Sequence, residues 1–180
     1  MLPYFPKAGF LEQHRLLCGI PGKIAMSIDH AKFMALAIEE SRKGLRVGER
    51  PFGSVVVRGD QIVARAYAVV NSSGDPTTHA ETLAVRAATA HLKSLSLKGC
   101  TLYTSCDPCP MCAGAMFNSH IDRLIIGAPY QALMCLTGRP PRSYSVEELS
   151  KQMNIQLEVV RGVLQDEAET VLAEYKWPKG

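Results

Sequence analysis

The 180-residue sequence lacks several features that would assign it to a special class of protein. It has no run of 18 apolar residues, so no membrane-spanning helix is expected. It also lacks internal repeats, low-complexity segments and runs of five or more like charges, which argues against a solenoid or a charged interaction tail. With 20 basic and 17 acidic side chains the formal net charge is only +3, which neither demands nor excludes a nucleic-acid partner.

The N-terminus lacks the continuous apolar segment of a secretory signal. Prolines and the polar residues 12–15 interrupt it, so we expect residues 1–25 to be a flexible extension and residues 26–180 to form one domain. Without an export signal we predict a cytoplasmic location, in which the six cysteines are reduced. A tight cluster of reduced cysteines favours a metal site over disulfides.

The spacing of apolar residues predicts an α/β fold. A helical pattern extends from about residue 29 to 42 and should end at Gly44. Two β-branched runs, 54–57 and 62–69, flank the turn residues 59–60 and predict a hairpin. Strands and helices then alternate, which implies helices packed around a largely parallel sheet.

Three smaller features also carry expectations. The segment 71–78 has the composition of a loop, and Thr77 or Thr78 is available to cap the helix that opens with His79. Met134 and Cys135 have the spacing of core residues. Arg139 and Arg142 stand beside prolines, which is typical of a solvated loop, although arginine also suits a lid or a phosphate contact.

Two short stretches, HAE at 79–81 and CDPCPMC at 106–112, point to metal chemistry. A catalytic zinc site needs three protein ligands and an open position, and His79, Cys109 and Cys112 could supply that set. Because two residues separate the two cysteines, one helix start can turn both thiolates toward one ion. Glu81 could then accept a proton from water that the metal activates and pass it on, serving first as base and then as acid.

The cysteine spacing also bears on two other kinds of metal site. An iron–sulfur cluster of the ferredoxin kind needs a further cysteine at position 116, which is Met116 here, so the sequence excludes it. A purely structural zinc site remains an alternative, with the ligands Cys100, Cys106, Cys109 and Cys112. It would leave the HAE stretch without a role.

The combination H-x-E…P-C-x-x-C is the signature of zinc-dependent nucleobase deaminases. From about residue 29 onward the sequence resembles the cytidine/deoxycytidylate deaminase superfamily in PFGSVVV, GDPTTHAE, LYTSCDPCPMCAGA and IDRLIIGA. The resemblance implies a three-layer α/β/α fold with a central five-stranded mixed sheet flanked by helices, and a homodimer. It also implies one Zn²⁺ per chain on His79, Cys109 and Cys112, Glu81 as the catalytic proton carrier, and substrate contacts from Phe52, Asn71 and Pro108.

The resemblance leads to three hypotheses of function. PFG and TSC-x-PCPMC look most like guanine or guanosine deaminases, so the first hypothesis is deamination of a small purine base or nucleoside. MCAGAM and SHIDRLIIGA look like the tRNA adenosine deaminases that make wobble inosine, which is the second. The third is a non-catalytic protein that zinc stabilises. In purine-acting relatives an asparagine usually stands eleven residues before the histidine. That position is Ala68 here, and we expect Asn71 or a backbone group to replace it.

Overall fold

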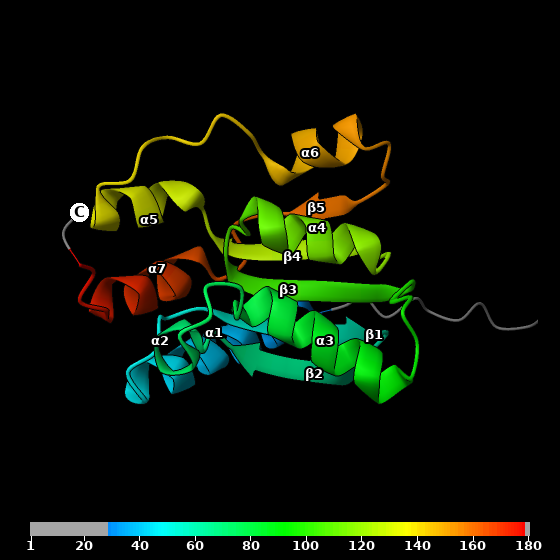
Figure 1. The fold of residues 1–180 in the computed structure, drawn as a ribbon, viewed down its shortest axis with the longest axis horizontal. Helices are drawn as coiled ribbons and strands as arrows, with labels where there is room; N and C mark the ends of the chain where they lie inside the picture. Colours follow the sequence, from blue (N-terminus) through cyan, green and yellow to red (C-terminus); the bar gives the residue numbers. More distant parts are fainter. Residues whose placement is uncertain (1–28, 179–180) are drawn as a thin grey trace, which may run out of the picture.

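The computed structural model describes residues 29–178, so the extension predicted for residues 1–25 lies outside the described part of the chain. One five-stranded sheet forms its centre, in the order β2-β1-β3-β4-β5 (Figure 1). The strands are β1 (Gly53–Arg58), β2 (Gln61–Tyr67), β3 (Cys100–Cys106), β4 (Arg123–Ala128) and β5 (Glu158–Val160). The helices are α1 (His30–Arg46), α2 (Val70–Ser73), α3 (Ala80–Leu92), α4 (Pro110–Asn118), α5 (Tyr130–Thr137), α6 (Val146–Gln152) and α7 (Gln165–Glu174).

The sheet is mixed. β1 pairs antiparallel with both β2 and β3, whereas β3 with β4 and β4 with β5 are parallel. The predicted hairpin is present, with Gly59 supplying the positive φ of 61° that its turn requires. The parallel pairs are joined by connections that contain α4 or α5 and α6, as parallel pairing requires. The predicted antiparallel hairpin and the mixed five-stranded sheet are therefore confirmed, and the parallel part consists of β3, β4 and β5.

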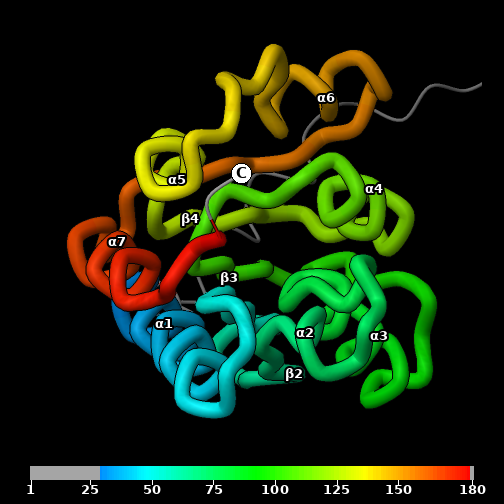
Figure 2. The backbone as a smooth tube through the Cα atoms, turned by 60° about the vertical axis from the view of Figure 1, so that its left-hand side comes forward, coloured from blue at the N-terminus to red at the C-terminus, as the bar shows by residue number. Residues whose placement is uncertain are grey.

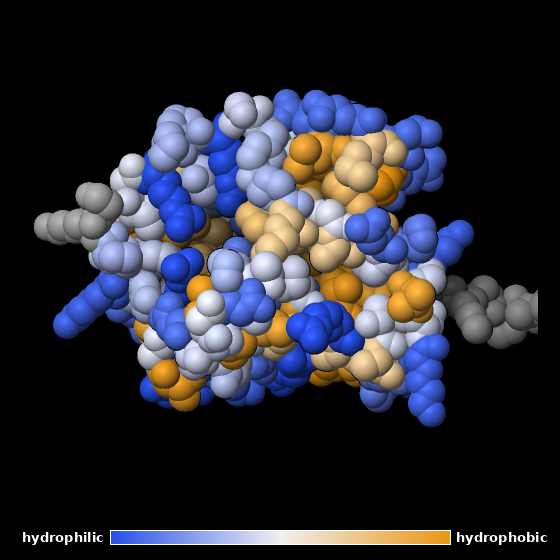
Figure 3. All heavy atoms as spheres, viewed as in Figure 1, coloured by the Kyte–Doolittle hydropathy of each residue, from blue (hydrophilic) through white to orange (hydrophobic). Residues whose placement is uncertain are grey.

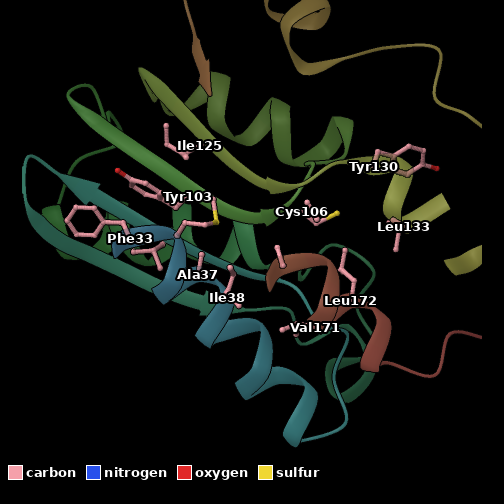
Figure 4. Packing of buried hydrophobic residues seen from close by; sticks show 14 of the residues in the cluster. Phe33, Ala37, Ile38, Tyr103, Cys106, Ile125, Tyr130, Leu133, Val171 and Leu172 are labelled. Carbon is pink, nitrogen blue, oxygen red and sulfur yellow. The ribbon is translucent and has the colours of Figure 1, made fainter. Parts of the chain in front are cut away.

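Helices cover both faces of the sheet, which confirms the predicted three layers (Figure 2). One apolar cluster joins α1, α5 and α7 to one face, and Figure 4 shows Phe33 and Ile38 of α1 in it with Val171 and Leu172 of α7. A second cluster joins the opposite face to α3, α4 and α6 through residues such as Ala84, Met116 and Val146. Successive strand residues point to opposite faces, so each buried strand contributes to both clusters.

Gly53 lets α1 approach the sheet closely. A Cβ at this position would overlap the backbone of α1 at Ala37 and Ser41 and would lie 2.8 Å from the Cβ of Glu40. The Gly53 N–H also donates to Ser105 Oγ at 3.1 Å, which ties β1 to β3 beside the end of the strand. This close packing fixes the position of Phe52, the residue immediately before it.

Several local expectations were wrong. α1 begins after its cap Asp29 but continues beyond Gly44 to Arg46, because Gly44 packs against Tyr67 and does not end the helix. The stretch expected to be a loop begins inside the short helix α2. No threonine caps α3, because His79 itself occupies the N-cap position. Cys135 is exposed, since it lies on the outer side of α5, whereas Met134 packs against the core.

None of the helices within residues 29–178 is long and apolar enough to cross a lipid bilayer.

Candidate active site

Two helix N-termini bring the candidate metal ligands together. His79 is the N-cap residue of α3, and Cys109 is the N-cap residue of α4. Pro110 occupies the start of α4, where its fixed φ favours a helix and its missing N–H costs nothing, and Cys112 follows in the first turn. The unpaired N–H groups at a helix N-terminus stabilise thiolate charge, so this arrangement suits two cysteine ligands.

The spacing of the three donor atoms fits a zinc ion. His79 Nδ1 lies 3.6 Å from Cys109 Sγ and 3.5 Å from Cys112 Sγ, and the two sulfur atoms are 3.5 Å apart. Tetrahedral zinc, with bonds of about 2.3 Å to sulfur and about 2.0 Å to nitrogen, places such donors about 3.5–3.8 Å apart. Imidazole with thiolates is also a donor set that zinc prefers over magnesium or calcium. His79, Cys109 and Cys112 therefore fit zinc in both geometry and chemistry.

Without a bound metal the two cysteine ligands differ in ionisation, because the hydrogen bond with Cys109 raises the pKa of Cys112. Contacts with the Cys112 thiol and with His79 lower the pKa of Cys109 to about 4, so this sulfur is readily available as a thiolate. The hydrogen bond with Cys109 in turn raises the pKa of His79. Burial raises the pKa of the Cys106 thiol to about 12.

The four-cysteine structural site is excluded by the course of β3. Cys100 and Cys106 lie at opposite ends of this strand, so they cannot bind the same ion. Among the described residues, the group of histidine, cysteine and acidic side chains close enough to share an ion is His79, Cys109 and Cys112. Cys106 is 3% exposed and packs in the core, as expected for a small buried residue.

Glu81 is a buried carboxyl beside the ligands. It lies in the first turn of α3 and is 6% exposed. Burial raises its pKa. A carboxyl group with a raised pKa exchanges its proton closer to neutral pH, which is the property that a proton carrier needs.

These side chains open into a cavity of about 50 Å³, here called the catalytic cavity. Phe52 lines it as expected, and Arg50 and Leu133 line it although sequence reasoning did not select them. The full lining is Arg50, Phe52, His79, Glu81, Asp107, Cys109, Leu133, Arg139 and Arg142. Figure 3 shows a hollow with hydrophilic side chains along its rim on the face that carries the N-terminal ends of α3 and α4.

The structure does not bring the other two expected substrate contacts to this cavity. Asn71 lies outside the lining, and its side-chain amide donates to Gly48 O at 2.8 Å and to Tyr175 Oη at 3.2 Å. Pro108 is buried beside the site; its carbonyl accepts a hydrogen bond from Arg142, and it lines a neighbouring groove. Ala68 is fully buried and donates its N–H to Phe52 O, so it offers a substrate no side-chain hydrogen bond.

The segment that joins α5 to α6 borders the catalytic cavity. The Arg142 guanidinium lies 3.6 Å from the centre of the Tyr130 ring and donates to Pro108 O at 2.9 Å. Arg142 and Asp107 separate the cavity from a groove of about 610 Å³. Arg161 spans this groove with ion pairs to Asp107 at 2.8 Å and Glu147 at 2.7 Å. The arginine-containing segment is therefore part of the site and not a remote solvated loop.

The sequence pattern of one protein family matches the part of the chain that builds this site. That family is described as the cytidine and deoxycytidylate deaminase zinc-binding region, and the match covers residues 27–128. The chain belongs to this deaminase family. Its members are hydrolases of C–N bonds, and the His79, Cys109 and Cys112 cluster lies within the matched residues.

The chain is similar to relatives with different substrates. A tRNA-specific adenosine deaminase of Bacillus subtilis is 34% identical over 79% of this chain and 86% of its own length. A guanine deaminase of the same bacterium is 42% identical over 50% of this chain and 58% of its own length. The matched part spans only 8% of the chloroplastic tRNA(adenine(34)) deaminase of Arabidopsis thaliana, which is 40% identical over 56% of this chain.

Solved structures give the same two classes. The guanine deaminase from Nitrosomonas europaea superposes with a TM-score of 0.71 at 26% identity, covering 81% of this chain and 84% of the other. A tRNA:A34 deaminase superposes with a TM-score of 0.66 at 29% identity, covering 78% of this chain and 99% of the other. The fold and the family are thus shared with guanine and with tRNA adenosine deaminases alike.

Proposed function

We propose that this protein is a zinc-dependent deaminase that replaces the exocyclic amine of a purine-like base by oxygen and releases ammonia. The observation that carries the proposal is the position of Glu81, a buried carboxyl that shares one small cavity with His79 and Cys109. A protein that used zinc only for folding would not need an ionisable group buried at this position, because burying a carboxylate costs stability.

The residues of the site have three roles: metal binding, proton transfer and packing against the base. His79, Cys109 and Cys112 would hold one zinc ion, which when bound activates water for attack on the ring carbon that bears the amine. A Glu81 carboxylate oxygen accepts a proton from the attacking water and delivers it to the adjacent ring nitrogen. Glu81 then accepts the remaining proton of the added hydroxyl group and delivers it to the amine, which leaves as ammonia as the C=O bond forms. Phe52 and Leu133 supply the apolar wall against which a flat ring can lie.

Guanine or guanosine is the first substrate proposed, on the motif likeness around Phe52 and Cys109 and on the guanine deaminase relatives. Adenosine in tRNA is a second candidate that the comparisons support equally. The specific observation in its favour is that Arg50, Arg139 and Arg142 all line the catalytic cavity. Arginine side chains attract phosphate, which free guanine lacks.

Ammonia release from a panel of substrates tests the proposal. Zinc-loaded protein would be incubated with guanine, guanosine, adenosine, cytosine and a tRNA anticodon stem-loop, and metal content would be measured on the same sample. We expect about one zinc per chain and turnover of at least one purine substrate. Turnover of a pyrimidine alone, or of none of these compounds, would contradict the assignment.

The assembly state and location stay predictions of this proposal. We expect a homodimer, and light scattering that returns the mass of a single chain at micromolar concentration would contradict it. A cytoplasmic location is checked by fractionating cells that produce the protein.

A further inference from the structure

The catalytic cavity adjoins a second cavity of about 300 Å³, here called the C-terminal pocket. Arg50 and Arg139 line both cavities and so stand where a ligand would pass from one to the other. The other residues that line the C-terminal pocket are Asn71, Thr137, Tyr175, Trp177 and Pro178.

The C-terminal pocket carries positive charge that its own lining does not neutralise. None of its lining residues is acidic, and neither Arg50 nor Arg139 makes an ion pair within residues 29–178. The neighbouring acid Glu49 is buried, and its carboxylate accepts the backbone N–H groups of Asn71 at 2.8 Å and Ser72 at 2.7 Å. By contrast, Arg161 in the groove on the other side of the catalytic cavity is paired with two carboxylates.

The aromatic wall of the C-terminal pocket is held in place by specific contacts. Trp177 Nε1 donates to Leu172 O at 3.0 Å, and the rings of Tyr175 and Trp177 meet edge to face at 4.8 Å. Trp177 also packs against Phe52 of the catalytic cavity, with ring centres 5.8 Å apart. The two cavities therefore share an aromatic partition as well as two arginines.

We propose that the C-terminal pocket binds a phosphate group of the substrate, with Arg50 and Arg139 as its ligands, while the target base occupies the catalytic cavity. The substrate is then a phosphorylated nucleoside, either a mononucleotide or one residue of a strand. This narrows the substrates proposed above, because it favours adenosine in tRNA, or a guanine nucleotide, over free guanine or guanosine. Arginine is suited to this task because its planar donors pair with phosphate oxygens two at a time. The inference rests on the proposed deaminase function, because it assumes that the target base binds in the catalytic cavity beside the phosphate.

Binding can be measured without turnover because Trp177 is the sole tryptophan of the chain. Its fluorescence in the zinc-loaded protein would be followed on titration with ribose 5-phosphate, with ribose, and with a trinucleotide. The first probe carries the phosphate of a mononucleotide, and the last carries the phosphodiesters of a strand. We expect a saturable change with at least one phosphate-bearing probe and none with ribose.

Variants assign the binding to the two arginines. The double variant Arg50→Gln/Arg139→Gln should bind the phosphate-bearing probe about ten- to hundredfold more weakly, as expected for loss of charge-assisted hydrogen bonds. The single variant Arg139→Gln should show part of this loss of affinity. Because Arg139 is exposed, its substitution should not prevent folding, so this variant tests the inference even if Arg50→Gln does not fold. Arg58→Gln is the matched control, since Arg58 is an exposed arginine of β1 that lines neither cavity.

The results overturn or support the inference independently of the deaminase assignment. The inference would be overturned if neither phosphate-bearing probe gave a saturable change in fluorescence, or if the double variant bound the probe as tightly as the wild type. In ammonia-release assays, kcat/KM should be at least about tenfold higher for a phosphate-bearing substrate than for the same nucleoside, and the double variant should lose this preference. Phosphate-dependent fluorescence without any ammonia release would leave the C-terminal pocket assigned and contradict the deaminase proposal.

Discussion

Two glycine-to-alanine substitutions should change stability in opposite directions. At Gly53 a methyl group would overlap the backbone of α1 and lie 2.8 Å from Glu40 Cβ, so α1 must move away from β1. Overpacking of this kind costs about 1–3 kcal/mol. At Gly114, inside α4, nothing lies within 4 Å of the added methyl group. Alanine favours a helix over glycine by about 0.8–1.0 kcal/mol, so Gly114→Ala should stabilise the protein.

Scanning calorimetry of the zinc-loaded proteins measures both effects. A change of 1 kcal/mol moves the Tm of a domain of this size by about 2–4 °C. Gly53→Ala should therefore lower the Tm by about 2–12 °C, and Gly114→Ala should raise it by about 2–4 °C. Because Gly53 positions Phe52 at the catalytic cavity, Gly53→Ala should also lower activity. An unchanged Tm for Gly53→Ala, or a lower Tm for Gly114→Ala than for Gly53→Ala, would refute this account of the packing.

Three further outcomes are expected. Removing zinc with a chelator should lower the Tm of the wild type, because zinc at a thousandfold excess over its Kd adds about 4 kcal/mol to the free energy of unfolding. Calorimetry of Cys109→Ser should show no such decrease in Tm, and an equal decrease would count against the ligand set. The hydrogen bond from Arg161 lowers the pKa of Glu147. In urea titrations above the usual glutamate pKa of about 4.3, Glu147→Gln should therefore lose about 0.5–1 kcal/mol of stability, and this loss should vanish as the pH falls through the lowered pKa. An equal loss at all pH values, or a similar loss in the exposed control Glu174→Gln, would disprove the link. A thiol reagent should label the exposed Cys135 faster than the buried cysteines of β3, and peptide mass mapping that finds the reverse order would be inconsistent with the structure.

The sequence predicted the scaffold well because its signals are local. The alternation of β-branched runs in 54–57 and 62–69, with a turn pair between them, is enough to define the β1–β2 hairpin. The three candidate ligands could be named because helix starts, with Pro110 in the second of them, bring a histidine and a cysteine pair to defined positions.

The substrate side of the site could not be predicted in the same way. Asn71 has a suitable side chain, but the paths of α2 and α7 direct its amide to Tyr175 and away from the catalytic cavity. Arg50 and Arg139 are 89 positions apart by residue number, and only the packing of the chain places both between two cavities. Cys135 was misplaced because helical spacing alone does not show which side of α5 is exposed.

The central claim is that Glu81 moves protons at a zinc site held by His79, Cys109 and Cys112. The most direct test is to measure zinc content and ammonia release together for Glu81→Gln, with Glu40→Gln as a control that alters another buried glutamate in a different layer. Glu81→Gln should keep its zinc and lose about 10²–10⁴-fold in ammonia release, whereas Glu40→Gln should keep both. Full activity of zinc-loaded Glu81→Gln on a substrate that the wild type deaminates would contradict the account.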